Sequence, residues 1–244
     1  MLQVCLNGAR DRSECRSLPV TAEELAAEAR RAVATGAEDI HLHPKDADGR
    51  DSLAPESVAE AVAAVRAAVP RSVPVGVTTG AWAAPEPQHR VRLIRSWSVL
   101  PDHASVNWHE EGAEEVAGVL LERGIGVEAG IYSGTEAARG FLASPLSGRV
   151  LRVLAEVTDT DPGTAAATAA DLLRELGDEL MAPVLLHGEE GGAWPVLRVA
   201  AQHGLDARIG LEDVLVLPDG SPAGDNAALV HTARRLLRTA ASAG

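Results

Sequence analysis

Cysteine is scarce in this sequence, with only Cys5 and Cys15 among 244 residues. Two cysteines cannot form a disulfide framework, and no Cys/His cluster accompanies them as a structural zinc site would require. Long apolar runs are also lacking. None approaches the roughly 20 residues of a membrane span, and polar residues near the start interrupt any signal peptide. These absences predict a protein of the cytoplasm.

Lysine is rarer still, because Lys45 is the only one and any Schiff-base mechanism would depend on it. Acidic residues outnumber arginine and lysine together, and the formal net charge is −13. A surface of this sign repels a phosphate backbone or an anionic membrane. We therefore predict that the protein binds neither nucleic acid nor membranes.

What the sequence does have is a regular alternation of short β-branched apolar runs with helical stretches rich in Ala, Leu, Glu and Arg. The predicted strands are residues 2–6, 39–43, 73–78, 104–108, 126–131, 150–157, 183–187 and 207–212. The predicted helices include residues 21–35, 55–69, 111–123, 164–176, 194–203 and 226–240. The first opens with a capping box of Thr21 and Glu24. The helices after the third and fifth strands are less distinct, because Pro85 and Pro87 delay one and the other is short.

Eight such βα units can form a closed barrel or an open doubly wound sheet. Their number, and a length near the ~250 residues typical of such barrels, favour closure. No linker or low-complexity segment divides the chain. We predict an α/β fold, a single (β/α)8 TIM barrel that spans residues 1–244 as one catalytic domain. In that fold the C-terminal ends of the strands carry the chemistry.

Polar residues stand at most of these predicted strand ends. They are His41, His43, Thr78, Thr79, Asn107, Glu128, Glu156, Asp159, His187, Glu212 and Asp213. Thr78, Thr79 and Gly80 offer hydroxyls and a closely approachable backbone for an anionic substrate group, although a Thr-Gly pair is also ordinary turn chemistry. We place Asn107 with them as a substrate-binding candidate.

The segment HLHPK holds the clearest metal signature. His41 and His43 are two residues apart on a predicted strand, so both imidazoles point to one side. Glu212, at the end of a strand two places away around a closed barrel, offers a third ligand. Two histidines and one carboxylate leave an open position, as catalytic zinc sites do. An isolated His-x-His pair is weak evidence, and the strand-end position is what favours a metal.

The eighth predicted strand carries Arg208 on the same face as Gly210 and Glu212. An arginine that points into a barrel needs an anionic partner, and the forked guanidinium suits a substrate carboxylate. A buried ion pair with Glu156 or Glu128 is the alternative. Sequence alone leaves both open.

Several motifs, in this order and spacing, span nearly the whole chain. They are NGA (7–9), LPVTAEELAAEA (18–29), HLHPKDADG (41–49), VTTG (77–80), PDHASVN (101–107) and RIGLEDVLVLPDG (208–220). With these motifs the chain resembles the β-keto acid cleavage enzymes, the family that includes 3-keto-5-aminohexanoate cleavage enzyme.

The resemblance implies a zinc-dependent reaction in which a 3-keto acid and acetyl-CoA give acetoacetate and a new acyl-CoA through a metal-stabilised enolate. The metal ligands it implies are His41, His43 and Glu212. It makes Arg208 the anchor of the keto acid carboxylate and Asp213 the base that removes the proton between the two carbonyls. Glu128 becomes a polar partner of that proton transfer. Because barrels of this family assemble, we also expect a homo-oligomer, either a dimer or a tetramer.

The chain departs from the family pattern in three places. Lys45 stands in HPKD where the family commonly has HVRD, so it replaces an arginine. Arg10 or Asp11 stands where many members carry an acidic residue after the first strand. The acidic loop at residues 188–192 lacks the basic character expected beside CoA. Both the keto acid and the acyl acceptor therefore stay open.

Two other functions remain open as well. One is a metal-dependent hydrolase or lyase on the same barrel, and the other is a non-catalytic relative that binds a metabolite. In the amidohydrolase-like barrels the His-x-His pair ends the first strand, whereas here it ends the second and Lys45 follows directly. Retention of the whole set His41, His43, Arg208, Glu212 and Asp213 argues against the loss of catalysis.

Overall fold

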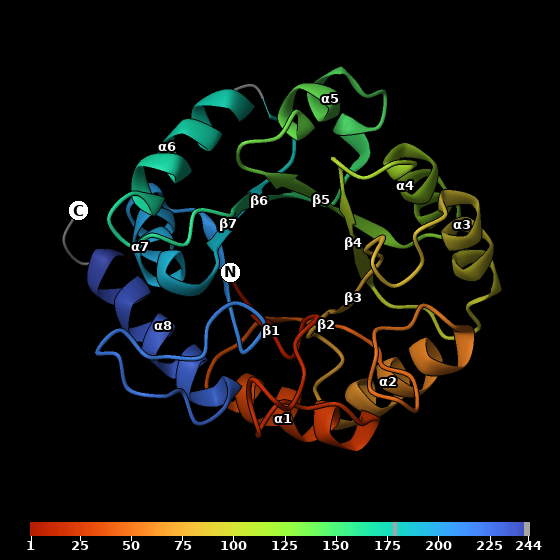
Figure 1. Cartoon of the computed structure of the whole chain (residues 1–244), viewed down its shortest axis with the longest axis horizontal. Coiled ribbons are helices and arrows are strands. Elements are labelled where there is room, and N and C mark those ends of the chain that lie inside the picture. The colour runs from red at the N-terminus through yellow and green to blue at the C-terminus, as the bar shows by residue number, and fades with distance from the viewer. Residues whose placement is uncertain (178–179, 242–244) are drawn as a thin grey trace.

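Parallel strands close into a barrel in sequence order, with helices forming an outer ring (Figure 1). This computed structural model describes residues 1–177 and 180–241. The strands are β1 Leu2–Cys5, β2 Asp39–Leu42, β3 Val75–Thr78, β4 His103–Asn107, β5 Gly126–Tyr132, β6 Arg152–Val157, β7 Val184–Gly188 and β8 Asp206–Ile209. The helices are α1 Ala22–Ala34, α2 Pro55–Ala68, α3 Pro87–Ser96, α4 Ala113–Glu122, α5 Ala137–Ala143, α6 Ala165–Leu176, α7 Ala193–His203 and α8 Asn226–Ala241.

The predicted (β/α)8 barrel is therefore confirmed. That residues 1–244 form one domain stays a prediction, and residues 178–179 and 242–244 lie outside the described part of the chain. In that part, no helix is long and apolar enough to cross a membrane.

Local sequence signals explain where the helices begin. The capping box at the start of α1 is present, since the Thr21 hydroxyl accepts from the Glu24 backbone N–H and the Glu24 carboxylate accepts in return from the Thr21 N–H. Pro55 opens α2 and Pro87 opens α3, the position where a missing N–H costs nothing. Pro87 thus marks the start of the helix that the sequence left indistinct, and α5 spans only 7 residues.

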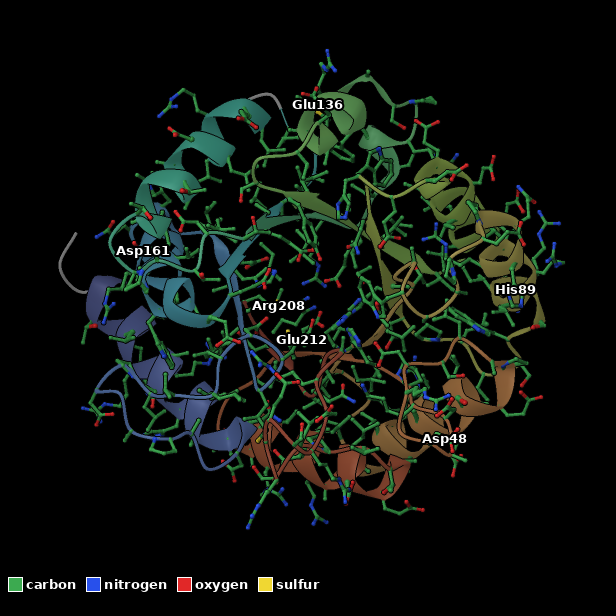
Figure 2. The ribbon with its side chains drawn as sticks, viewed as in Figure 1. Asp48, His89, Glu136, Asp161, Arg208 and Glu212 are labelled. Carbon is green, nitrogen blue, oxygen red and sulfur yellow. The ribbon has the colours of Figure 1, made fainter. Side chains whose placement is uncertain are left out.

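Strand register brings the two predicted metal-binding segments together. β1 pairs with β2 on one side, Cys5 opposite His41, and with β8 on the other, Gln3 opposite Arg208. Only one strand therefore separates the histidines from the arginine, as a closed barrel requires. Figure 2 shows Arg208 and Glu212 near the middle of the ring, whereas Asp48 and His89 lie at its periphery.

The eighth strand is shorter than predicted. β8 ends at Ile209, and the chain then turns, with the Asp213 and Val214 N–H groups both donating to the Gly210 carbonyl. A side chain at Gly210 would overlap the Cys5 backbone, so only glycine allows this close approach. Glu212 consequently lies in a turn after the strand, not on the strand face that it was predicted to share with Arg208.

A buried polar group fills the half of the barrel nearest the N-terminal ends of the strands. We call Gln3, Asp39, His103, Glu128 and Arg152 the lower cluster; each is at most 7% exposed. Asp39 contacts His103 Nε2 at 2.9 Å and Arg152 Nη2 at 2.6 Å. Glu128 contacts Arg152 Nε at 3.2 Å and His103 Nδ1 at 3.2 Å. Gln3 donates to both carboxylates, so every charged member has an opposite charge beside it.

Candidate active site

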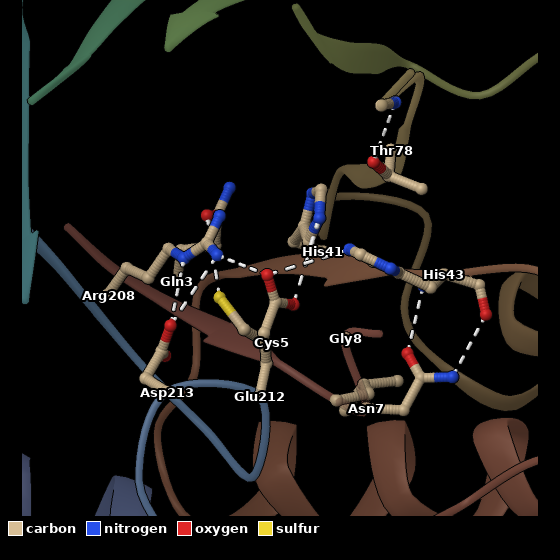
Figure 3. Close-up of polar contacts among 12 residues, drawn as sticks. Gln3, Cys5, Asn7, Gly8, His41, His43, Thr78, Arg208, Glu212 and Asp213 are labelled. Carbon is tan, nitrogen blue, oxygen red and sulfur yellow. Dashed lines mark hydrogen bonds and ion pairs between the residues drawn. The ribbon is translucent and has the colours of Figure 1, made fainter. Parts of the chain in front are cut away.

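The three predicted metal ligands converge at the C-terminal end of the barrel (Figure 3). Glu212 faces the Nε2 atoms of both histidines, at 3.8 Å from His41 and 3.6 Å from His43. One donor atom from each of the three residues lies within 4.8 Å of the other two. His43 lies one residue beyond β2, and its imidazole still shares the side of the barrel that His41 occupies.

This group fits a divalent cation on two grounds. The His–Glu separations are too long for hydrogen bonds, yet they suit donors that share an ion, because ligands about 2.0–2.2 Å from tetrahedral zinc lie roughly 3.4 Å apart. Glu212 Oε2 is also buried and has no hydrogen-bond partner within the described residues. A buried carboxylate oxygen without a donor is costly unless something positive compensates it.

The pKa values of the two histidines are shifted in opposite directions. Burial lowers the pKa of His41 to about 3, in spite of the nearby Glu212 carboxylate. Burial also lowers the pKa of His43, but the Glu212 and Asp51 carboxylates outweigh it and raise that pKa to about 9. His41 is therefore the neutral imidazole that a metal requires, while His43 would have to release a proton on metal binding.

Arg208 and Asp213 stand beside this group. Arg208 Nη2 lies 2.5 Å from Glu212 Oε1, and its Nε lies 3.5 Å from Asp213 Oδ1. The alternative prediction, that Arg208 forms a buried ion pair with Glu156 or Glu128, is therefore wrong. The turn after β8 folds Glu212 and Asp213 back onto the guanidinium, and these two carboxylates are its partners. Asp213 is 1% exposed, and its Oδ2 has no hydrogen-bond partner in the described chain.

His187, at the end of β7, links two acids of the site. Its Nδ1 lies 3.4 Å from Asp213 Oδ1 and its Nε2 lies 3.3 Å from Glu156 Oε2. Burial and Arg208 lower the pKa of His187, but Asp213 and Glu156 raise it to about 9. His187 was not among the predicted site residues. Its strand-end position was the available signal, although no motif contains it.

The loop after β1 contacts both His43 and Glu212. Asn7 brackets His43, donating to its carbonyl and accepting from its N–H, both at 2.9 Å. Arg10 donates to the Glu212 carbonyl and forms ion pairs with Glu14 and Glu190. Glu14, an acidic residue farther along this loop, pairs with Arg10 at the mouth of the barrel.

Among the predicted substrate-binding residues, Thr78 lies on the far side of His41 and His43 from Arg208 (Figure 3). Each of the predicted substrate-binding residues forms a hydrogen bond with a nearby residue. The Thr78 hydroxyl accepts from the Gly80 N–H, and the Thr79 hydroxyl donates to the Ser105 carbonyl at 2.6 Å. Asn107 donates to Glu110 at 2.9 Å. Their predicted contact with substrate stays a prediction.

Glu128 lies deeper than its predicted role suggests. It is fully buried in the lower cluster, and its Oε2 is 3.9 Å from His41 Nδ1. The structure therefore places it behind a candidate metal-binding histidine. Its part in proton transfer also stays a prediction.

A cavity of about 460 Å³ opens above the three ligands. Its walls come from the loops after several strands, and the residues that line it are Ala9, Arg10, Glu14, His43, Trp82, Tyr132, Glu156, His187, Glu189, Glu190, Arg208, Glu212 and Asp213. The volume suits a small molecule. Arg208, Asp213, His43 and Glu212 all lie in its wall.

A closed barrel whose C-terminal end gathers two histidines, a glutamate and a buried Arg–Asp pair defines a TIM-barrel protein with a candidate metal-dependent active site. A sequence model of the β-keto acid cleavage enzymes matches residues 1–243, so the chain belongs to the β-keto acid cleavage enzyme family. The resemblance inferred from the motifs is thereby confirmed. Among curated proteins, no sequence matches this chain.

Solved structures share the fold at low sequence identity. Apo ObcA has a TM-score of 0.72 at 15% identity, over 90% of this chain and 61% of ObcA. A ternary complex of ObcA with a C4-CoA adduct and oxalate has a TM-score of 0.70 at 16% identity, over 91% of this chain and 64% of ObcA. This chain thus spans less than two thirds of the ObcA chains. A type I 3-dehydroquinate dehydratase from Clostridium difficile has a TM-score of 0.65 at 12% identity, over 98% of this chain and 90% of the other.

Proposed function

We propose that the protein is a zinc-dependent β-keto acid cleavage enzyme, which converts a 3-keto acid and acetyl-CoA into acetoacetate and a new acyl-CoA. The observation that carries this proposal is the convergence of His41, His43 and Glu212 beside Arg208 and Asp213 in one cavity. Family membership supports the reaction class. The bound molecules of the ObcA complex support a site for an acyl-CoA and a small carboxylate.

His41, His43 and Glu212 would hold the metal ion. When bound there, a divalent cation supplies a Lewis acid that polarises the 3-keto oxygen and makes the C2 protons more acidic. Two histidines and one carboxylate leave a position for that oxygen. Glu212 stays ionised for this task, because burial raises its pKa but Arg208 and the histidines lower it well below its usual value.

Arg208 would anchor the substrate carboxylate. Its contacts with Glu212 and Asp213 use Nη2 and Nε, and no contact of Nη1 is found within residues 1–177 and 180–241. Arginine can present more than one N–H to a carboxylate in a fixed plane. Holding the carboxylate at Arg208 would place C2 of the keto acid next to Asp213.

Asp213 would accept the proton from C2, through the Oδ2 that has no other partner. The enolate carbon then attacks the thioester carbonyl of acetyl-CoA and expels the CoA thiolate. That thiolate attacks the original 3-keto carbon, the C2–C3 bond breaks, and the carbanion takes a proton back to give acetoacetate. His187, held between Asp213 and Glu156, would keep the base aligned.

Five further predictions belong to this proposal. Thr78, Thr79, Gly80 and Asn107 would contact the substrate after rearrangement of their local bonds, and Glu128 would assist proton transfer through His41. Acetyl-CoA would enter across the acidic mouth near residues 188–192. A homo-oligomeric state, measurable by light scattering, and a cytoplasmic location complete the set.

The decisive experiment measures metal content and turnover together. We expect about one zinc per chain in wild type purified without added metal, and none in His41→Ala/His43→Ala. The matched control is His89→Ala/His231→Ala, which removes two exposed histidines far from the ligands. Acetoacetate should form from a 3-keto acid panel with acetyl-CoA, stop after chelation, and resume with zinc.

The outcomes separate the alternatives. Zinc without acetoacetate, but with hydrolysis or lysis of other substrates, would favour a different reaction on the same barrel. Zinc with no turnover at all would favour a metabolite-binding protein. Absence of metal from wild type would contradict the proposal.

A further inference from the structure

Asp51 gathers three side-chain donors from different parts of the barrel mouth. Its Oδ2 accepts from His43 Nδ1 at 2.8 Å and from Trp82 Nε1 at 2.6 Å. Its Oδ1 accepts from Lys45 Nζ at 2.5 Å. The Asp51 side chain is only 6% exposed and the Lys45 side chain 2%, so the bonds of Asp51 to His43 and Lys45 are partly shielded from water, whereas the bond from Trp82, which is 48% exposed, lies at the surface.

The chain brings Asp51 to this place through a tight loop after β2. Residues 45 and 51 pair across the loop, and the Asp46 carboxylate accepts from the Asp48 and Arg50 N–H groups. Gly49, at φ +78°, allows the reversal. The loop therefore returns Asp51 to the back of His43, eight residues along the chain.

Lys45 and Trp82 extend this contact to the neighbouring strands. Lys45 Nζ also donates to the Gly8 carbonyl, at 2.7 Å, in the loop after β1. Trp82 comes from the loop after β3, and its ring is stacked on the His43 imidazole, with centroids 5.8 Å apart and planes at 16°. The loops after β1, β2 and β3 are thus connected through Asp51 and Lys45, next to the candidate metal ligand His43.

We propose that Asp51 is a positioning residue, which fixes the ring of His43 so that Nδ1 is bonded to the Asp51 carboxylate and Nε2 is presented to the metal. This inference rests on the proposed metal site at His41, His43 and Glu212. A carboxylate that accepts from one imidazole nitrogen sets the tautomer and increases the electron density available at the other. Lys45 balances the charge of Asp51, and Trp82 limits rotation of the ring.

The two histidines show why His43 depends on this bond. His43 carries a 2.8 Å bond from Nδ1, whereas His41 Nδ1 has its closest carboxylate oxygen, on Glu128, at 3.9 Å and lacks a hydrogen-bond partner in the described part of the chain. His41 is held by β2 itself. His43 lies beyond the end of the strand, where Asn7 hydrogen-bonds to both its N–H and its carbonyl. Loss of Asp51 would therefore free the ring of His43 far more than that of His41.

The test is the zinc affinity of the full chain, measured by competition with a chromophoric chelator, which needs no turnover. We expect Asp51→Asn to bind zinc roughly 10–100-fold more weakly than wild type. The matched control Asp48→Asn lies in the same loop, is 70% exposed and makes no contact with the site, so its affinity should equal that of wild type. Trp82→Phe keeps a ring over His43 and loses only the donor to Asp51, so its loss should be smaller.

A second measurement covers the case in which Asp51→Asn fails to fold. In wild-type protein with 15N-labelled histidine, identified by comparison with His43→Asn, the Nδ1 of His43 should carry a hydrogen-bonded proton and zinc should shift Nε2. Coordination through Nδ1 would overturn the inference. So would equal zinc affinities of Asp51→Asn and wild type. Zinc binding without acetoacetate formation would sink the proposed reaction and leave the role of Asp51 standing.

Discussion

Two buried polar groups occupy the same barrel and differ in how completely their members are paired. The lower cluster surrounds Asp39 and Glu128. The upper group, which we call the upper cluster, consists of His41, His43, His187, Arg208, Glu212 and Asp213. In the lower cluster each carboxylate oxygen has a cation or an amide within 3.2 Å. Among the described residues, two buried atoms of the lower cluster lack a hydrogen-bond partner, Glu128 Oε2 and His103 Nδ1, and these face each other at 3.2 Å. The upper cluster has five such atoms, which are Glu212 Oε2, Asp213 Oδ2, His41 Nδ1 and both ring nitrogens of His187.

We infer from this difference that the lower cluster stabilises the fold and that the upper cluster is the candidate site for chemistry. Buried polar atoms are normally satisfied, because an unmade bond costs about 1–3 kcal/mol. The two atoms that lack a hydrogen bond in the lower cluster belong to opposite charges that contact each other, whereas Glu212 Oε2 and Asp213 Oδ2 of the upper cluster are available to a ligand. Four predictions examine this contrast, beginning with the largest expected effect.

Asp213→Asn should lower kcat roughly 10²–10⁴-fold, because an amide cannot accept the C2 proton. The free energy of unfolding should fall by less than in Arg152→Met, because Asn keeps an oxygen opposite Arg208 and His187 and the replaced Oδ2 has no hydrogen-bond partner to lose. Acetoacetate formation and urea unfolding measure the two effects. A large loss of stability with normal turnover would place Asp213 with the structural residues.

Arg152→Met should have the opposite profile. It leaves Asp39 and Glu128 without their shared guanidinium, and breaking a buried ion pair by removing one partner costs about 3–5 kcal/mol. Zinc affinity of the folded fraction should stay at the wild-type value. Unfolding in urea, followed by circular dichroism, gives the cost. A fully stable variant with weakened zinc binding would show that the two clusters act as one.

The pH dependence of stability should reveal the lower cluster through His103. Burial lowers the pKa of His103, but the Glu128 and Asp39 carboxylates outweigh it and raise it to about 10, above the ordinary 6.5. The imidazolium therefore contributes its full stability below pH 6.5 and loses it as the pH rises through 10. This amounts to about 1.4 kcal/mol per pH unit for one proton.

Urea midpoints between pH 6.5 and 10, in wild type and His103→Gln, check this expectation. His187, with a pKa raised to about 9, acts in the same direction, so the difference between the two proteins isolates His103. A variant with the same slope as wild type would mean that His103 is neutral in the folded protein.

Gln3→Leu should produce the smallest change. Gln3 donates to Asp39 at 3.1 Å and to Glu128 at 2.8 Å, but both acceptors keep Arg152 and His103. We expect a loss of about 1–3 kcal/mol in the free energy of unfolding and unchanged kcat. Thermal unfolding and initial rates are sufficient measurements. A fall in kcat comparable to that of Asp213→Asn would erase the distinction between the clusters.

The order of the strands and helices could largely be predicted from the sequence. Alternation of apolar runs and helical stretches gives the number and type of elements, because burial against a sheet imposes its own periodicity on each element. The spacing of His41 and His43 predicts a shared side for both rings, and that is what the structure shows. Strand ends were less predictable. The end of β8 depends on how closely Gly210 approaches Cys5, a contact 205 positions apart in the chain.

The candidate site was also predicted only in part from the sequence. Glu212 and Arg208 were found from their motif, but their mutual contact depends on the turn that folds Glu212 back over the strand. His187 was seen only as a polar residue at a strand end, because its partners Asp213 and Glu156 come from other strands. Asp51 was missed because the turn that returns it to His43 has no distinctive motif. Glu128 could be seen as polar, yet only the barrel register shows that it faces His41 from the lower cluster.

By itself the sequence determined the barrel, the family and the identity of the candidate metal ligands, because these depend on local periodicity and on residue types at strand ends. The tertiary structure decided which buried charges are paired, which atoms are left for a ligand, and which carboxylate stands behind each histidine. Those properties are set by distances of a few ångströms between strands that are far apart in the chain. Local propensity has no means of specifying them.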